Sequence, residues 1–252
     1  MSSYQSLAGC YDAFTADVDY AAWAEYLCKH FALSGERVET VLDLACGTGS
    51  LSMLLAEAGY EVIGADASEE MLAIAQAKAW SAPEPRPMFL HQDMEHLDLY
   101  GTVDAAVCCL DSLNYLASAQ ALYTAIGRLR YFVRPGGLLI FDVNTDAKFR
   151  ALDGCAFLRE SPEYFCAWSA EYQQQERLCT FYYDIFRRSG SLWAREQEEH
   201  VERAHAEEEL AAALAQAGFC LNARFGELSF EPPAAGAHRI FYVARREENG
   251  ER

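Results

Sequence analysis

The segment Asp43-Leu44-Ala45-Cys46-Gly47-Thr48-Gly49 follows an apolar run that begins at Thr40, and it precedes a helical pattern over residues 50–58. Glycines at such a turn let the backbone adopt positive φ angles and approach a ligand closely. In doubly wound sheets, ligands bind at the carboxyl ends of the strands. The segment therefore predicts a strand, a ligand-binding turn and a helix, which together open an α/β fold.

Apolar strand patterns alternate with helical patterns on both sides of this turn. The alternation predicts an α/β fold with a doubly wound parallel sheet. The expected strands are residues 40–45, 60–65, 88–91, 103–110, 138–143, 219–225 and 239–245. The expected helices are residues 4–15, 20–33, 50–58, 69–78 after an N-cap at Ser68, 122–132, and a last helix that ends before Gly218.

Between about residues 150 and 200 the pattern changes to period 2 with many aromatic residues, which predicts an antiparallel β insertion after the fifth strand. A hairpin turn is expected at residues 188–191. The aromatic side chains either pack one face of this sheet or, as a group, cover a pocket for an apolar or cationic molecule. They are Tyr164, Trp168, Tyr172, Phe181, Tyr183, Phe186 and Trp193.

The length of 252 residues fits a single domain, residues 1–252. We expect it to have four parts: an N-terminal helical lid over residues 1–37, a cofactor-binding core over 38–145, the β insertion or substrate cap over 150–200, and a return to the core over 201–246.

The chain is strongly acidic, with 20 Lys and Arg against 38 Asp and Glu and a net charge of −18. This charge disfavours nucleic acid and anionic membranes as partners. Nine cysteines are scattered without a CxxC pair, so neither a disulfide framework nor a zinc site is expected, and no metal. Free thiols, no evident signal peptide and no membrane-spanning run predict a cytoplasmic protein.

The charges around the glycine turn indicate which ligand it holds. Asp66 ends the second expected strand, where a carboxylate can accept both hydroxyls of a ribose. A dinucleotide would need a third glycine where Ser52 stands, and its pyrophosphate would be repelled by Asp43. The ammonium group of S-adenosylmethionine would be attracted by the same carboxylate. The charges favour that cofactor, with a nicotinamide dinucleotide as the alternative.

The sequence resembles the class I S-adenosylmethionine-dependent methyltransferases of the small-molecule type. Ala45 stands where many members have glycine. The resemblance implies a seven-stranded Rossmann-like sheet whose last strands form a reversed edge. The similar segments are Asp43–Gly49, Gly64–Leu72, Gln92–Met94, Leu110–Leu116 and Arg134–Gly137.

The same resemblance implies a set of cofactor-binding residues. Asp43 would lie near the ammonium group, Asp66 at the ribose and Asp93 at the adenine amino group. Leu110 would lie under the sulfonium, and the tyrosines would belong to an N-terminal lid. The set is Tyr11, Tyr20, Asp43, Ala45, Gly47, Asp66, Ala67, Met71, Asp93, Met94 and Leu110.

Asp111 and His200 are the candidate catalytic residues. As alternatives, Asp111 and Asn114 cap the next turn, and His200 is a surface histidine. The glutamates between residues 196 and 209 are read most simply as a solvated face.

The expected activity is methyl transfer from S-adenosylmethionine to a small-molecule acceptor. No dyad that would supply a strong base is evident, which favours a nitrogen or an acidic oxygen as the nucleophile. The alternatives are an RNA methyltransferase on the same fold and a non-catalytic S-adenosylmethionine-binding protein. The oligomeric state is not predicted.

Overall fold

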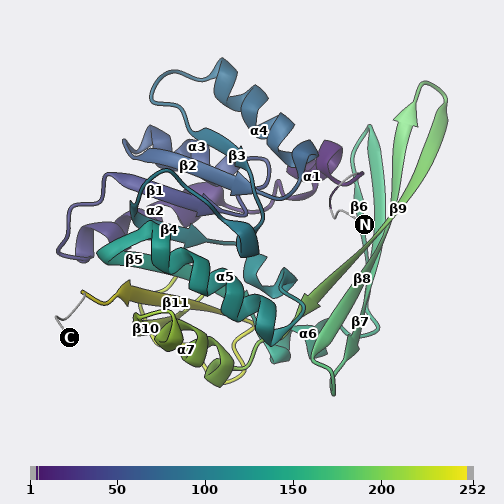
Figure 1. Ribbon diagram of the computed structural model, residues 1–252. Coiled ribbons are helices and arrows are strands. Elements are labelled where there is room, and N and C mark those ends of the chain that lie inside the picture. Colours follow the sequence, from purple (N-terminus) through teal and green to yellow (C-terminus); the bar gives the residue numbers. More distant parts are fainter. Residues whose placement is uncertain (1–3, 5, 249–252) are drawn as a thin grey trace.

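The computed structural model describes residues 4 and 6–248, and its main element is a sheet of seven strands in the order β10-β11-β5-β4-β1-β2-β3. Strands β1 to β5 pair in parallel, whereas β11 is antiparallel to both β5 and β10. The predicted seven-stranded, doubly wound α/β fold is therefore confirmed (Figure 1). The strands are β1 Thr40–Leu44, β2 Glu61–Asp66, β3 Met88–His91, β4 Val103–Cys108, β5 Val133–Asn144, β10 Phe219–Gly226 and β11 Arg239–Arg246.

Helices cover both faces of this sheet because successive side chains of a strand point to opposite sides. Leu42 and Leu44 of β1 belong to a core cluster that includes the apolar sides of α5 and α7. Val41 belongs to a second cluster with α2 and α3 on the other face. The helices are α1 Ala8–Phe14, α2 Tyr20–Leu33, α3 Ser50–Glu57, α4 Glu69–Ser81, α5 Ala119–Phe132, α6 Asp146–Leu152 and α7 Glu207–Gln216, with short turns η1 Met94–His96 and η2 Ser112–Tyr115.

The local helix signals act as predicted. Ser68 accepts a hydrogen bond from the backbone of Met71 and so caps α4. Gly218, with a φ of 74°, follows the end of α7. Some expected bounds were wrong: α1 begins at Ala8 rather than residue 4, α5 at Ala119 rather than residue 122, and β5 at Val133 rather than residue 138. The helix α6 was not expected at all.

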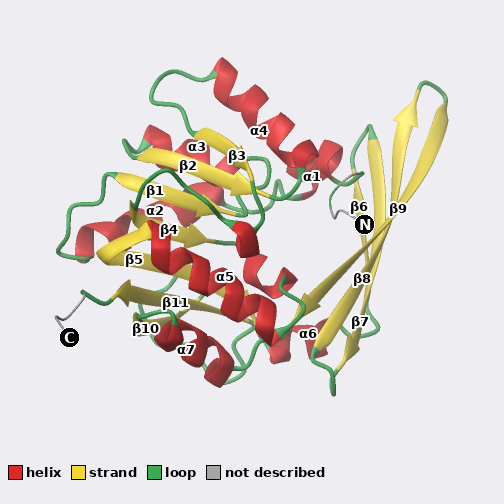
Figure 2. Cartoon of the chain, viewed as in Figure 1, coloured by secondary structure: helices red, strands yellow, loops and turns green. Residues whose placement is uncertain are grey.

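The β insertion is a separate four-stranded antiparallel sheet in the order β6-β7-β8-β9. Figure 2 shows it standing beside the main sheet, with its long β8–β9 hairpin projecting from the body. The short, largely exposed β6 was not predicted, and β9 is longer than expected. The strands are β6 Ala156–Glu160, β7 Tyr164–Gln173, β8 Leu178–Ser189 and β9 Leu192–Arg203.

One face of this sheet is turned toward the body of the protein. Trp168, Tyr183 and Glu198 lie opposite one another on β7, β8 and β9, and they share this inner face. Phe186 and Trp193 have the other parity and lie on the outer face, so the expectation that all seven aromatic residues share one face was wrong. Side chains alternate between the two faces along a strand, and the positions of Phe186 on β8 and Trp193 on β9 place both side chains on the face away from the body of the protein.

The segment before α2 packs on the inner face. Leu7 and Cys10 form a buried cluster with Cys166 and Ile185 of the antiparallel sheet. Glu198 accepts hydrogen bonds from the backbone N–H groups of Ser6 and, at 3.0 Å, Leu7. The antiparallel sheet and the N-terminal segment therefore meet beside the carboxyl ends of β1 and β4.

None of the described helices has the length and apolar character needed to cross a membrane.

Candidate functional site

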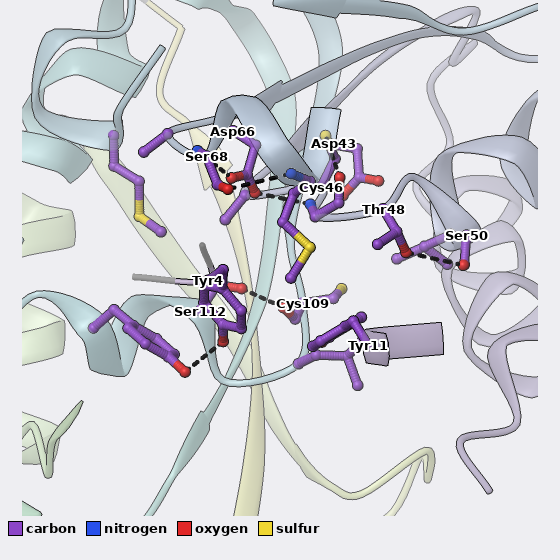
Figure 3. A pocket seen from close by; sticks show the side chains of 18 of the residues that line it. Tyr4, Tyr11, Asp43, Cys46, Thr48, Ser50, Asp66, Ser68, Cys109 and Ser112 are labelled. Atoms are coloured by element: carbon purple, nitrogen blue, oxygen red, sulfur yellow. Dashed lines mark hydrogen bonds between the residues drawn. The ribbon is translucent and has the colours of Figure 1, made fainter. Parts of the chain in front are cut away.

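A cavity of about 320 Å³ lies at the carboxyl ends of β1, β2, β3 and β4, within the size range of small-molecule sites. Its wall consists of the turns that follow these strands, together with tyrosines of the N-terminal segment (Figure 3). All eleven residues expected from the sequence to bind the cofactor line this one cavity. They are Tyr11, Tyr20, Asp43, Ala45, Gly47, Asp66, Ala67, Met71, Asp93, Met94 and Leu110.

The turn after β1 has an unusual backbone. Ala45, Gly47 and Gly49 have φ angles of 59°, 54° and 75°, in the left-handed region that favours glycine. Ala45 is strained there by roughly 1–2 kcal/mol. The strain is the one that glycine, which the family resemblance implies at this position, would avoid.

Close packing beneath the turn explains a further glycine. A Cβ atom on Gly64 of β2 would lie 2.6 Å from the Phe89 ring and 2.9 Å from the Cys46 sulfur. Both distances are too short for a real contact, so Gly64 allows β2 and the turn to approach each other. Cys46 has a packing role here, as a small residue at the turn.

Asp43 lies deep in the cavity wall. Its side chain accepts a hydrogen bond from the Ser52 hydroxyl at 2.5 Å. Burial, only partly offset by this bond, raises the pKa of Asp43 to about 7. Ser52 stands where a dinucleotide-binding motif would have its third glycine, and here its hydroxyl orients the Asp43 carboxylate.

Asp66, at the end of β2, faces the cavity and closes the turn. It accepts hydrogen bonds from the backbone N–H groups of Gly47 and Ser68, both at 2.8 Å. Burial raises its pKa, whereas the N–H donors act in the opposite direction. Each carboxylate oxygen has a further lone pair, so Asp66 is still able to accept ribose hydroxyls.

Asp93 lies at the outer rim of the cavity. Its carboxylate accepts hydrogen bonds from the backbone of Glu95 and His96 and from the His96 ring, each at 2.9 Å. These bonds fix η1, and they bring the neighbouring Met94 into the cavity wall.

The charge of the wall discriminates between the two ligands considered from the sequence. Three carboxylates, those of Asp43, Asp66 and Asp93, line the cavity, and among its described lining residues there is no Lys, Arg or His. A pyrophosphate would have no basic partner, and Asp43 would repel it. The ammonium and sulfonium of S-adenosylmethionine match this wall, and the residues present therefore fit that cofactor.

A strained turn after β4 forms the end of the cavity opposite Asp66. Leu110 and Asp111 have φ angles of 58° and 56°, and Asp142 of β5 accepts their two backbone N–H groups at 2.7 and 2.9 Å. Arg239 of β11 pairs with Asp142 and, at 2.7 Å, with Asp111. The ion pairs hold a backbone conformation that would otherwise be unfavourable.

The capping interpretation of Asp111 and Asn114 was wrong. Asp111 has no side-chain bond to η2 and pairs with Arg239 instead. The Asn114 amide donates to the carbonyls of Asn144 and Arg203, at 3.0 and 2.8 Å, and so joins β5 to β9. Asp111 itself does not line the cavity, although Leu110 and Ser112 on either side of it do.

His200 is not the surface residue that the sequence alternatively allowed, because it is only 1% exposed. It lies on the inner face of β9, and its Nδ1 is 3.1 Å from the Tyr115 hydroxyl. Its ring packs against that of Tyr4, with centroids 4.5 Å apart. His200 is thus behind Tyr4 and Tyr115, which line the cavity.

The solvated-face interpretation of the glutamates was also wrong for two of them. Glu198 and Glu202 share the inner face of β9 with His200 because their positions differ by two residues. Glu198 pairs with His200 at 3.0 Å, and Glu202 is 4% exposed. Their neighbour Glu199 lies on the outer face and is exposed.

Sequence reasoning missed part of the cavity wall. Some missed residues, such as Cys46 and Gln92, lie inside the similar segments Asp43–Gly49 and Gln92–Met94. Their place within those segments could have identified them as part of the cavity wall. Tyr4 had no such signal, because only the fold brings the N-terminal segment to η2. The missed residues are Tyr4, Cys46, Thr48, Ser50, Leu51, Ser68, Gln92, Cys109, Ser112 and Tyr115.

In the described part of the chain, no group of three or more His, Cys, Asp or Glu side chains has the arrangement of a metal site.

Comparison with known proteins agrees with this geometry. Residues 41–137 match the family model described as "Methyltransferase domain". "Putative methyltransferase YqeM" of Bacillus subtilis (strain 168) is 32% identical over 96% of this chain and 97% of its own length.

Two solved structures are similar over nearly the whole chain, including the antiparallel sheet. The S-adenosylmethionine-dependent methyltransferase from Clostridium acetobutylicum ATCC 824 has a TM-score of 0.86 and 29% identity, covering 98% of this chain and 100% of that one. The sugar N-methyltransferase KedS8 from Streptoalloteichus sp ATCC 53650 has a TM-score of 0.78 and 23% identity, covering 94% and 93%.

Proposed function

Because this chain belongs to the S-adenosylmethionine-dependent methyltransferases, we propose that it transfers the methyl group to a small molecule through a nitrogen or an acidic oxygen of that acceptor. Its cofactor is S-adenosylmethionine, and it is an enzyme of the transferase class. The nature of the acceptor is the proposed part.

The observation that carries the proposal is the enclosure of one end of the cavity. Tyr4 and Tyr11 of the N-terminal segment line the end opposite Asp66 (Figure 3). Tyr115 of η2 also lines the cavity, and its hydroxyl bonds to that of Tyr4. Behind these rings stands the inner face of the antiparallel sheet. Such walls leave room for a small acceptor, whereas a polymer would need an open groove.

The proposed role of each cofactor-binding residue follows from its position. Asp43 pairs with the ammonium group, Asp66 accepts the ribose hydroxyls and Asp93 accepts the adenine amino group. The bound cofactor supplies a methyl group on a positively charged sulfur, which is strongly electrophilic. The strained Leu110–Ser112 turn forms the floor next to that methyl group, and in-line alignment of the acceptor there is worth up to roughly 7–11 kcal/mol.

We assign the remaining segments to acceptor binding and closure. Residues 1–37 would act as a lid and residues 150–200 as a substrate cap, around the core of residues 38–145 and the return over 201–246. Support comes from Glu198, which fastens the backbone of the N-terminal segment to β9. The lid and the cap thus meet over the acceptor end.

An RNA acceptor is the less favoured alternative. The net charge of −18 opposes binding of a phosphate backbone. We propose a cytoplasmic location, supported by nine cysteines that are all free thiols.

The test is methyl transfer from labelled S-adenosylmethionine to amines, phenols and transfer RNA, offered separately. We expect label in an amine or a phenol and none in the RNA. Label in RNA alone would contradict the small-molecule proposal. Tight cofactor binding without turnover on any acceptor would favour a non-catalytic binding protein.

A further inference from the structure

We propose that the Tyr115 hydroxyl accepts a proton from the methyl acceptor and passes its own proton to His200, which Glu198 holds in place. This inference rests on the proposed small-molecule function and assigns the proton-accepting group of the same site. Tyr115 is the catalytic residue because it would touch the acceptor, whereas His200 and Glu198 act through it. The sequence gives no sign of this arrangement, because only the fold brings η2 against β9.

The first observation is a chain of hydrogen bonds that leads from the cavity to a carboxylate on β9. The Tyr115 hydroxyl lies 3.1 Å from Nδ1 of His200, and Nε2 of the same ring lies 3.0 Å from Oε2 of Glu198. An ionised carboxylate only accepts hydrogen bonds, so Nε2 carries the ring proton and Nδ1 is left to accept one. The imidazole is therefore oriented as a base toward Tyr115, with an anion behind it.

The second observation is that Glu198 keeps its negative charge, although its side chain is only 9% exposed. Burial acts to raise the pKa of this carboxyl, but hydrogen bonds from His200 and from the backbone N–H groups of Ser6 and Leu7 outweigh burial. They hold the pKa of Glu198 below its ordinary value. A fixed anion at Nε2 stabilises the imidazolium ion that forms when His200 takes a proton.

The third observation is the position of the Tyr115 hydroxyl at the cavity. Tyr115 lines the cavity together with Leu110 and Ser112, and it ends the short turn η2 that follows them. Its oxygen also bonds to the Tyr4 hydroxyl, which leaves one lone pair for a proton of the acceptor. Burial raises the pKa of Tyr115 well above its ordinary value, so the hydroxyl stays neutral and exchanges one proton for another.

The other groups that face His200 do not compete for this proton. Tyr4 and Tyr183 pack against its ring, with centroids 4.5 and 4.9 Å away, and burial raises the pKa of both hydroxyls. Glu202, at the next inner-face position of β9, is 4% exposed, and burial raises its pKa well above the ordinary value. Both tyrosines and Glu202 are therefore neutral, and Glu198 is the charged group that pairs with the ring.

The transfer step balances with the groups named. The acceptor gives one O–H or N–H proton to the Tyr115 oxygen while the Tyr115 proton moves to Nδ1 of His200. The lone pair freed on the acceptor forms the new bond to the methyl group as the bond between methyl and sulfur breaks, and that electron pair stays on the sulfur, which becomes neutral. His200 is left as an imidazolium ion beside Glu198. After the product departs, the proton returns through Tyr115 to the cavity and to solvent.

Two variants and a matched control test this relay. Tyr115→Phe removes the hydroxyl and keeps the ring, and His200→Gln keeps hydrogen-bonding groups that take up no proton. Tyr242→Phe makes the same change as Tyr115→Phe at a buried ring of β11 that does not line the cavity. Thermal unfolding and calorimetric titration with S-adenosylhomocysteine establish that each variant folds and keeps the cofactor site.

The acceptors are offered in pairs that differ in whether a proton has to be removed before attack. At pH 8, phenol and benzylamine carry that proton, whereas 4-nitrophenol is ionised and aniline has a free lone pair. We expect Tyr115→Phe and His200→Gln to lower kcat about 100-fold or more on phenol or benzylamine, and less than about threefold on the counterpart, because a general base typically contributes at least 100-fold. Tyr242→Phe should leave all these rates unchanged.

The pH profile gives a readout that a merely structural role would not move. At saturating cofactor, the wild-type rate on phenol should be nearly level from pH 7 to 9, because the relay takes the proton. In either variant only the ionised phenolate would react, so the rate should rise about tenfold per pH unit below the pKa of a phenol, which is about 10.

Equal losses on both members of a pair would overturn the inference and leave the small-molecule function intact, because they would show that Tyr115 and His200 only shape the site. Wild-type rates and pH profiles in both variants would do the same, as would wild-type transfer to 4-nitrophenol or aniline alone. If His200→Gln does not fold, Tyr115→Phe decides, since it deletes a single oxygen. Transfer to RNA and to none of the four small molecules would overturn both proposals.

Discussion

The affinity for S-adenosylmethionine should depend steeply on pH because of Asp43. In the free protein, burial raises the pKa of this carboxyl to about 7. The cofactor ammonium favours the ionised form, so binding must release the proton. The α-amino group of the cofactor, with a reference pKa of about 8, stays protonated between pH 5 and 7. The affinity should therefore be lost as pH falls through 7.

The size of the effect follows from the fraction of ionised Asp43. With a free pKa of about 7, roughly half of the protein is ionised at pH 7 and about 1% at pH 5. The dissociation constant should rise about 50-fold between these values, which equals about 2.3 kcal/mol. The same raised pKa affects the free energy of unfolding. Between about pH 4 and 7 the folded protein holds a proton on Asp43 that the unfolded chain has lost, so the free protein becomes less stable as pH rises through this range.

The assay is isothermal titration calorimetry at pH 5, 6 and 7, with two buffers of different ionisation enthalpy at pH 6. We expect release of nearly one proton per cofactor at pH 6. Asp43→Asn should remove most of the slope, and the remainder belongs to Asp66, whose pKa is also raised. Asp98→Asn, on the exposed surface, is the control. A constant affinity from pH 5 to 7, or an unchanged slope in Asp43→Asn, would refute the role of Asp43.

Three further predictions concern packing and ion pairs. Gly64→Ala should lower the free energy of unfolding by about 1–3 kcal/mol, measured with urea, because its Cβ would overlap Phe89; unchanged stability would contradict the close packing. Arg239→Met should cost about 3–5 kcal/mol by leaving Asp142 buried without its cation, and a neutral effect would argue against that pair. Glu198→Gln should speed amide hydrogen exchange of Ser6 and Leu7 at least tenfold, since the charged acceptor of their N–H groups is lost; unaltered exchange would show that Glu198 does not fasten this segment.

Much of the cavity wall was predictable because its residues lie at or just after the carboxyl ends of strands that the sequence marks clearly. Asp43 is the fourth of the five residues of β1 and Asp66 is the last residue of β2, and the carboxyl ends of adjacent parallel strands meet at one edge. Local sequence therefore specifies a three-dimensional cluster. The same holds for Asp93, after the third strand.

The acceptor side was not predictable in the same way. Tyr4, Tyr115 and His200 come from three distant segments, and their meeting depends on how the antiparallel sheet docks. Charged residues in a period-2 strand are also ambiguous, since the alternation does not say which face is buried. Nor did any local signal connect Asp142 to Arg239, 97 residues later.

The alternation of β9 implies a route by which acceptor choice can change without altering the core. Glu198, His200 and Glu202 face inward at every second position, so a slip of one residue against β8 would replace them all with outer-face side chains. A slip of two that brings Glu198 to the place of His200 would also bring His200 to the place of Glu202. The outlying hairpin between Ser189 and Leu192 is where an insertion or deletion could produce such a slip. The length of this hairpin loop therefore determines which side chains of β9 face inward at the other end of the strand. A redesign of this enzyme should begin by fixing the register of β8 and β9.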